Sequence, residues 1–121
     1  MNLINYPKCG DVFFASLPME GNVQGGVRPV VVIQNDIGNK HSPIVNIIPM
    51  SSKVDKAKYL PIHVVIPADA TNGLKMDSVV LTEQTRIIQR DQLLSRIGFL
   101  RNTDLARIKR AWDIQFPFRA S

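Results

Sequence analysis

Three polar clusters in this sequence contain side chains that can act on an anionic substrate. The first is the stretch 24–29, Gln-Gly-Gly-Val-Arg-Pro, which leads into the apolar run 30–33. Two glycines let the backbone come close to a partner, and Pro29 suits the start of a strand, where no ladder donor is needed. A guanidinium held between such a loop and a stiff strand can bind a phosphate through two parallel hydrogen bonds. The bland alternative is that Arg28 is a surface residue beside a strand.

The second and third clusters stand next to other apolar runs. Ser51, Ser52 and Lys53 follow the run 44–50, with two further lysines close behind. They supply several donors to one phosphate, or they are ordinary residues of a solvated turn. The third cluster, 83–86 (Glu-Gln-Thr-Arg), interrupts an apolar strand, where polar side chains either line a groove or form an outward-facing bulge.

The remaining residues that could do chemistry give weaker indications. Histidine is a common general base near neutral pH, but His63 lies on the strand face opposite its aliphatic neighbours, which favours a structural or interface role. His41 has no obvious partner. Two histidines and one cysteine are too few for a metal site, so we expect no metal and no cofactor. Cys9 has no base near it and is predicted to be inert.

Composition bounds the class of protein. The 121 residues, 45% of them hydrophobic, predict a single domain over 1–121 with a real core. The net charge of +5 favours an anionic partner, nucleic acid before others, although such an excess also serves solubility. The N-terminus lacks the apolar block of a signal peptide, and no apolar run approaches membrane-spanning length. We therefore expect a soluble, cytoplasmic protein without membrane contact.

These residues must be positioned by short strands followed by one helix. Alternating and β-branched runs predict strands at 11–15, 30–34, 44–50, 62–66, 78–81 (resuming after a bend at 86–88) and 96–100. The loop 16–27 is long for a hairpin and is a candidate functional flap. Asn102, Thr103 and Asp104 are expected to cap a final helix with an apolar face of Leu105, Ile108, Trp112 and Phe116. The pattern predicts a mainly β (α+β) fold, a small antiparallel barrel closed by a C-terminal helix.

In this order, the segments resemble the MazF/PemK family of toxin endoribonucleases. The matching segments are Gly10-Asp11-Val12-Phe13-Phe14-Ala15, the block from Gln24 to Asp36, Lys56-Ala57-Lys58, Leu60-Pro61-Ile62-His63-Val64, and Asp77 to Gln84. The likeness runs from about Gly10 to Phe116, nearly the whole chain. The block 24–36 is far more specific than a short glycine motif.

The resemblance implies a homodimer of SH3-like barrels, each with a C-terminal helix, that cuts single-stranded RNA (mRNA) at a short sequence without metal. The expected products carry a 2′,3′-cyclic phosphate and a 5′-hydroxyl, and a cognate antitoxin is expected to cover the RNA site. The family's arginine and its catalytic hydroxyl map onto Arg28 and Ser51, and its RNA-contacting glutamine maps onto Gln84. The neighbouring residues of the two motifs complete the expected RNA-binding set: Gln24, Gly25, Gly26, Ser52 and Lys53.

This sequence departs from the family pattern at two places. Many members have a glutamate immediately before the Gln-Gly-Gly block, whereas here Val23 stands there and the nearest glutamate is Glu20. A family role of that glutamate as base therefore does not carry over directly. Relatives have threonine where Ser51 stands, so the hydroxyl is kept but the methyl group that stiffens the rotamer is lost.

Two other classes of function stay open on the sequence. A non-catalytic gyrase poison of the CcdB type has the same fold and acts through a C-terminal tail containing a tryptophan. Here the only tryptophan, Trp112, falls inside the helical pattern. A plain basic RNA-binding barrel would explain the charge without requiring Arg28 or Ser51.

Overall fold

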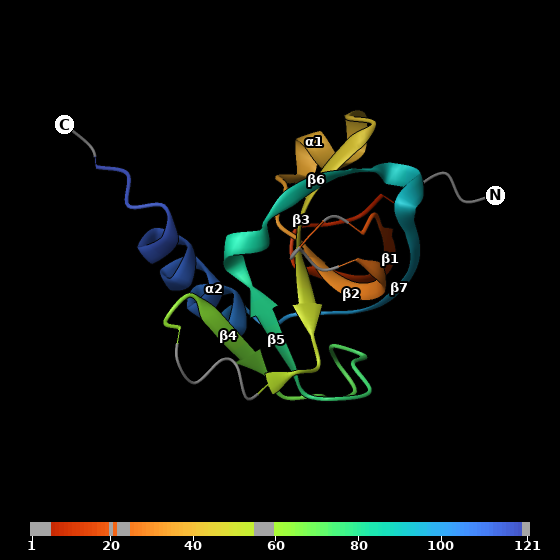
Figure 1. Ribbon diagram of the computed structural model, residues 1–121. Coiled ribbons are helices and arrows are strands. Elements are labelled where there is room, and N and C mark those ends of the chain that lie inside the picture. Colours follow the sequence, from red (N-terminus) through yellow and green to blue (C-terminus); the bar gives the residue numbers. More distant parts are fainter. Residues whose placement is uncertain (1–5, 20, 22–24, 55–59, 120–121) are drawn as a thin grey trace.

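The computed structural model describes residues 6–19, 21, 25–54 and 60–119 (Figure 1). In chain order the elements of this part are β1 (Asp11–Leu17), β2 (Gly26–Val32), α1 (Asp36–His41), β3 (Ile44–Ser51), β4 (His63–Ile66), β5 (Ser78–Leu81), the 3-10 turn η2 (Thr82–Gln84), β6 (Arg86–Gln89), the 3-10 turn η3 (Arg90–Gln92), β7 (Leu93–Phe99) and α2 (Asn102–Gln115).

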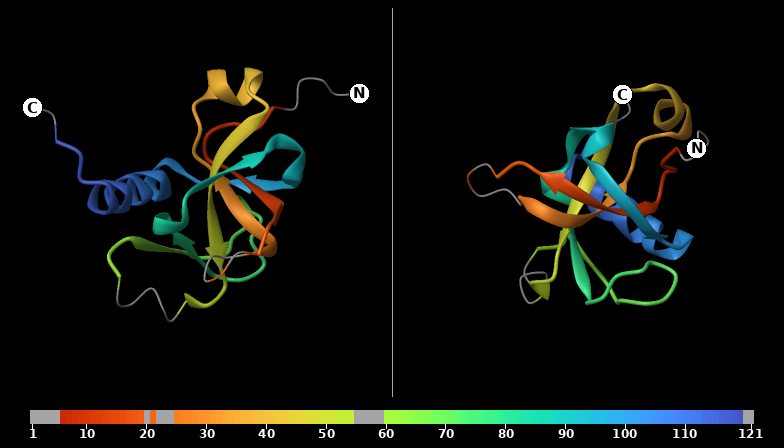
Figure 2. Two further views of the ribbon diagram at one scale, coloured as in Figure 1. Left: turned by 45° about the horizontal axis from the view of Figure 1, so that its top comes forward. Right: turned by 90° about the vertical axis from the view of Figure 1, so that its right-hand side faces the viewer.

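The strands form one strongly bent antiparallel sheet. Its order is β4-β5-β3-β2-β1-β7. One edge of β3 pairs with two strands in turn, with β6 along its first half and with β5 at its end. The mainly β fold with a C-terminal helix is confirmed, but the expected closure is not. No pairing joins β4 to β7 in the described part of the chain, so the sheet curls without closing (Figure 2).

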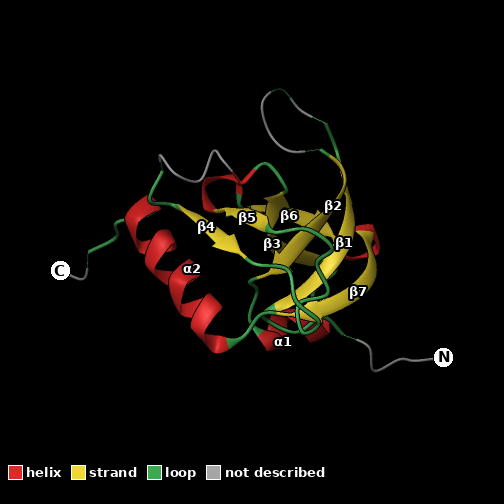
Figure 3. Ribbon diagram, turned by 90° about the horizontal axis from the view of Figure 1, so that it is seen from below, coloured by secondary structure: helices red, strands yellow, loops and turns green. Residues whose placement is uncertain are grey.

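Two cores lie on the two faces of this sheet, because strand side chains alternate between faces. On one face, α2 packs along β4 (Figure 3). The core there is made of Val12, Val31, Ile48, Met50, Val64, Ile66, Leu74, Val80, Leu100, Ile108 and Ala111. The opposite face curls around a second core, made of Ala15, Leu17, Val30, Val32, Val45, Ile47 and Ile88.

Most expected elements are present, with shifted ends. The bend between residues 81 and 86 is η2, and the last strand begins at Leu93 instead of residue 96. Between β2 and β3 lies α1, which is absent from the expected elements and whose N-cap Asn35 accepts a hydrogen bond from the Gly38 nitrogen at 2.9 Å. The cap predicted for α2 is wrong, since its N-cap is Arg101 and no side chain caps it. Asp104 nevertheless lies in the first turn, where a negative charge suits the helix dipole.

Candidate active site at the ends of strands β2 and β3

Arg28 lies inside a strand and not in the loop before one, which corrects the sequence expectation. β2 begins at Gly26 because its first half pairs with β1, with Arg28 opposite Ala15. The half-buried side chain of Arg28 turns back on its own hairpin, where its Nε donates a hydrogen bond to the Gly25 carbonyl oxygen at 2.7 Å. One edge of the guanidinium is thereby fixed, so the charge is held in place by the backbone.

The register of β2 and β3 runs toward the two predicted catalytic positions. The paired residues run to Val30 opposite Pro49. Carried two residues further, this register sets Arg28 across from Ser51, and residues directly opposite on neighbouring strands point to the same face. The β2–β3 pairs end at Val30, while Met50 and Ser51 pair with β5 on the other edge of β3. The two strands thus part at the point where Arg28 and Ser51 stand.

Ser51 is a buried hydroxyl at the end of β3. Ser51 is 6% exposed, and its Oγ accepts a hydrogen bond from the Lys53 backbone nitrogen at 3.1 Å. A hydroxyl that accepts in this way keeps its own hydrogen for donation to another group. Ser52 and Lys53, which follow, are exposed.

The predicted RNA-binding residues of the first motif are described in part. Gln24 and Glu20 lie outside the described residues, as does the segment 56–58. Gly25 is buried against Met19, whose Cα would lie 2.7 Å from a Cβ added at Gly25. Gly26 has a φ of +80°, a backbone conformation that favours glycine. Both glycines are therefore required by the shape of this bend.

A pocket of about 260 Å³ opens where β2 and β3 part, with Arg28 and Ser52 among its lining residues. The rest of its lining is mostly apolar and comes from β1, β2, β3, β5, β7 and the loop 67–77: Phe14, Val27, Pro29, Met50, Leu74, Lys75, Met76, Ser78 and Ile97. Phe13 and Phe14 are consecutive residues of β1, so their side chains lie on opposite faces of the sheet. The structure places Phe14 at the pocket and Phe13 against the second core. Lys75 and Met76 had no motif that could reveal them.

Gln84 and its neighbours lie further along the sheet. Gln84 is in η2, next to the middle of β3, and is not among the residues that line this pocket. Glu83 binds His63, whose Nε2 lies 2.8 and 3.0 Å from the two carboxylate oxygens. The His63 side chain is only 5% exposed. Of the two roles expected for His63, structural or interface, its burial and its pairing with Glu83 favour the structural one.

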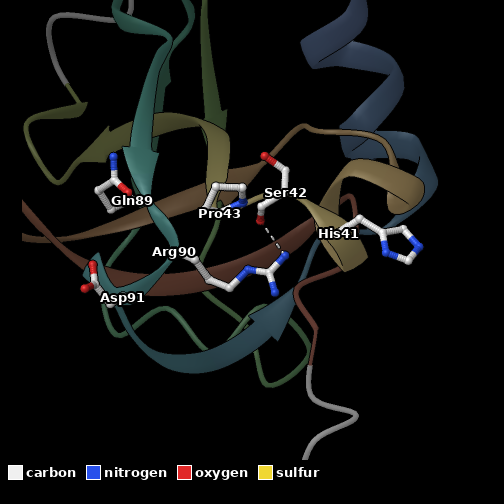
Figure 4. Close-up of a pocket in the computed structure, with 6 residues that line it drawn as sticks. All are labelled: His41, Ser42, Pro43, Gln89, Arg90 and Asp91. Carbon is white, nitrogen blue, oxygen red and sulfur yellow. Dashed lines mark hydrogen bonds between the residues drawn. The ribbon is translucent and has the colours of Figure 1, made fainter.

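A second arginine-lined pocket, of about 540 Å³, has a structural explanation (Figure 4). Arg90 reaches from η3 to the end of α1, where its Nη2 donates to the carbonyl oxygens of Asn39 and of Ser42, the latter at 2.7 Å. His41 and Asp91 line the same pocket. Carbonyl oxygens already accept hydrogen bonds from this guanidinium. Arg90 therefore holds the end of α1 in place, and the pocket is a poor site for an anion.

Other candidate chemistry is weak in the described part of the chain. It holds no group of three or more His, Cys, Asp or Glu residues that could bind a metal ion, and none of its helices has the length and apolar character needed to cross a membrane. Partial burial, with the carboxylates of Asp36 and Asp11 nearby, raises the pKa of the Cys9 thiol, which lowers its reactivity. Trp112 packs against the first core and contacts the ring of Phe116 at 4.5 Å between centroids.

Comparison with known proteins identifies the family. Residues 8–116 match the model of the PemK-like, MazF-like toxin of type II toxin–antitoxin systems. The chain belongs to this family. It is 45% identical over 108 residues to the endoribonuclease EndoA of Bacillus subtilis (strain 168), covering 88% of this chain and 91% of that protein.

Solved structures agree on the fold of this family. A crystal structure of MazF from Deinococcus radiodurans superposes with a TM-score of 0.79 at 23% identity, covering 93% of this chain and 98% of that one. An endoribonuclease in complex with its cognate antitoxin from Mycobacterial species gives a TM-score of 0.73 at 18% identity, covering 98% of this chain and 100% of that one. The open, curled sheet with its C-terminal helix is thus the family's fold.

Proposed function

We propose that this chain is the toxin of a toxin–antitoxin pair and acts as a sequence-specific, metal-independent endoribonuclease on single-stranded RNA. One feature supports this beyond family membership, namely the β2–β3 register, whose last pair is Val30 opposite Pro49 and whose continuation by two residues would set Arg28 across from Ser51. The two residues are 23 positions apart in the sequence, and only this register brings them to one end of the sheet. The net charge of +5 suits a polyanionic substrate.

The proposed reaction is an internal transfer at phosphorus. The ribose 2′-oxygen loses its proton and forms a bond to the adjacent phosphorus, while the bond from phosphorus to the 5′-oxygen breaks and that oxygen takes up a proton. The products are a 2′,3′-cyclic phosphate and a 5′-hydroxyl. DNA lacks the 2′-hydroxyl and is therefore not cut.

Arg28 and Ser51 stabilise the charge that builds up on the non-bridging oxygens. The guanidinium, steadied by Gly25, is the principal electrophile, and the Ser51 hydroxyl donates the second hydrogen bond. A guanidinium is a poor general base, so Arg28 is not assigned that role. His63 is not suited to that role either, because it is buried and bound to Glu83.

The other predicted residues bind the RNA chain on either side of the scissile bond. Gly25 and Gly26 let the backbone approach the RNA, and Gln24 stands beside them in the sequence. Ser52 and Lys53 are exposed directly after Ser51 and supply phosphate contacts. Gln84, further along the sheet in η2, contacts a more distant nucleotide of the same strand.

We also propose two protein partners in the cytoplasm, where the substrate mRNA is found. One is a cognate antitoxin with an acidic, partly disordered segment, whose charge would complement the +5 of this chain. The other is a second copy of this chain. Exposed apolar side chains on β6 and β7 support an interface, among them Ile87, Leu94 and Phe99.

Cleavage of single-stranded RNA in the presence of EDTA tests the proposed function. The wild-type chain should cut, and Arg28→Ala should reduce the rate at least about 10²- to 10³-fold, because a principal transition-state donor is lost. Arg110→Ala removes the same charge from an exposed position on α2 and should cut like wild type.

Three outcomes would contradict the proposal. Intact RNA together with a stable gyrase complex would support the poison of the CcdB type, although Trp112 lies in α2 and not in a tail. Binding of RNA without cutting would indicate a plain RNA-binding module. Unchanged cutting by a folded Arg28→Ala variant would remove the assigned mechanism while leaving the activity.

A further inference from the structure

The pocket beside Arg28 is not explained by the proposed catalytic pair. Arg28 and Ser51 point to one face of the sheet, whereas Phe14, Pro29 and Met50 lie at positions of the other face, and these line the pocket. Arg28 and Ser52 stand at its rim. The pocket therefore adjoins the proposed cleavage site. An RNA strand bound at that site would continue past it into the pocket.

One wall of the pocket is the loop 67–77, and buried contacts hold this loop firmly in place. Asn72, 2% exposed, donates through its side chain to the Pro67 carbonyl oxygen at 2.9 Å and accepts from the Leu74 nitrogen at 3.0 Å. The backbone nitrogen of Phe99 in β7 donates to the Thr71 oxygen at 3.1 Å. Leu74 itself belongs to the first core. Lys75 and Met76 follow directly after this anchor.

Lys75 and Met76 are exposed and have no structural task of their own. Met76 is 61% exposed. Lys75 makes no ion pair or side-chain hydrogen bond with any residue that the structure describes. A rigid loop therefore presents a soft apolar side chain and an unpaired cation at the edge of a mostly apolar pocket that also contains the ring of Phe14.

This combination is the chemistry that binds a splayed-out nucleotide. Single-stranded RNA is recognised through unstacked bases that stack on aromatic side chains, while cations hold the neighbouring phosphates. A polarisable methionine can cover the other side of a flat ring. An acidic peptide would be attracted by Lys75 but would leave the aromatic and apolar lining unexplained.

We propose that this pocket is a base-binding subsite for a nucleotide next to the scissile phosphate, with the base against Phe14 and Met76 and a phosphate on Lys75. The inference rests on the proposed endoribonuclease function and adds to it a position at which the RNA sequence is read. Shape selects the base, and Lys75 sets the register of the chain without selecting a base.

Two variants test the subsite, each with its own readout. Cut sites of the wild type and of Phe14→Leu are first mapped by sequencing 5′-hydroxyl ends. Phe14→Leu should broaden the nucleotide preference at one position near the cut and weaken binding of a 2′-O-methyl RNA of the mapped sequence roughly 5- to 100-fold, as expected for a lost stacking contact. Preference at the other positions should be unchanged.

Lys75→Ala should weaken binding of that same RNA without changing the nucleotide preference. The slope of log affinity against log salt should fall by about 0.7, the value expected for one phosphate contact to a single strand. Lys40→Ala is the matched control, because Lys40 is an exposed lysine in the last turn of α1, and its slope should equal that of wild type.

The proposal is overturned if folded Phe14→Leu keeps the wild-type preference at every position, or if Lys75→Ala has the salt slope of Lys40→Ala. Thermal unfolding of each variant establishes that it is folded. If the wild-type chain neither cuts nor binds RNA, the proposed function itself fails. Failure of the subsite alone gives a different result: the wild type cuts RNA, and the variants cut it at the same sites as the wild type.

Discussion

At the scale of single residues, Ser51 is held less tightly than the threonine expected from the family resemblance. Its Oγ has one backbone donor, Lys53, and no methyl group restricts its rotation about χ1. The neighbouring backbone is paired with Val79 of β5. A hydroxyl is therefore retained at a fixed backbone position, with more rotational freedom than a β-branched side chain would allow.

Two substitutions of Ser51 distinguish the effect of the hydroxyl from the effect of restricted rotation about χ1. Ser51→Thr should cut RNA at a rate within the same order of magnitude as wild type, because the donor is kept. Ser51→Ala should lower kcat by about 10²- to 10³-fold, as for the loss of one oxyanion donor. Single-turnover cleavage of the mapped RNA measures both. Equal rates for Ser51→Ala and wild type would contradict the role assigned to the hydroxyl.

At the scale of elements, the loop 67–77 depends on two glycines that allow it to lie against β7. Gly73 has a φ of +70°, and a Cβ added there would lie 1.9 Å from the Ile97 carbonyl oxygen. A Cβ added at Gly98 would lie 2.3 Å from the Thr71 oxygen. These close approaches of backbone to backbone position the wall that carries Lys75.

Gly73→Ala should therefore destabilise the fold by about 3 kcal/mol or more, through backbone strain and a clash that β7 must relieve. Gly21→Ala is the matched comparison, because Gly21 has a φ of +58° and, among the residues that the structure describes, no atom lies within 4 Å of the added Cβ. It should cost only about 1–2 kcal/mol, for the left-handed backbone alone. Urea unfolding measures both, and equal losses would contradict the clash.

The same elements show what the sequence could predict. Regular periods predicted most strands and α2, since burial enforces a period of two in a strand and about 3.6 in a helix. α1 was missed because its six residues contain one large apolar side chain, Ile37, and that side chain is exposed. The start of β2 was missed because glycines and a proline indicate a loop, whereas pairing with β1 extends the strand.

The candidate site also contains some residues that the sequence could predict and others that it could not. Arg28 and Ser51 were predicted because short motifs surround them, and their approach follows from a register that no local pattern encodes. Lys75 was not predicted because its place depends on distant contacts between the loop and β7. His63 was expected in a structural or interface role, but its partner Glu83 is 20 positions away and could not be named.

At the scale of the whole molecule, two carboxylates make the stability of the fold depend on pH. A hydrogen bond from the Asn72 backbone nitrogen, and then one from Arg101, hold the pKa of Asp69 below its ordinary value. Hydrogen bonds from the Cys9 nitrogen and the Asn39 side chain lower the pKa of Asp36. Each group contributes stability above its unfolded pKa, and that contribution is lost as the pH falls through the folded pKa.

Tm should therefore fall as the pH is lowered from about 5 to about 2, the range in which such carboxylates are protonated. Asp69→Asn should make this fall smaller, because one of the two linked groups no longer titrates. Asp91→Asn, at an exposed carboxylate outside these hydrogen bonds, should keep the wild-type slope. A wild-type slope for Asp69→Asn as well would show that this carboxylate contributes no linkage.

The placement of Arg28 on a paired strand, with the proposed base pocket walled by a separate loop, has an evolutionary consequence. Substitutions at residues 14 and 76, where the base is proposed to bind, can alter which RNA is chosen while the hydrogen bond from Arg28 to Gly25 stays as it is. Target preference can then drift among relatives without loss of turnover. Engineering of new cut sites on this scaffold should accordingly begin with those two positions.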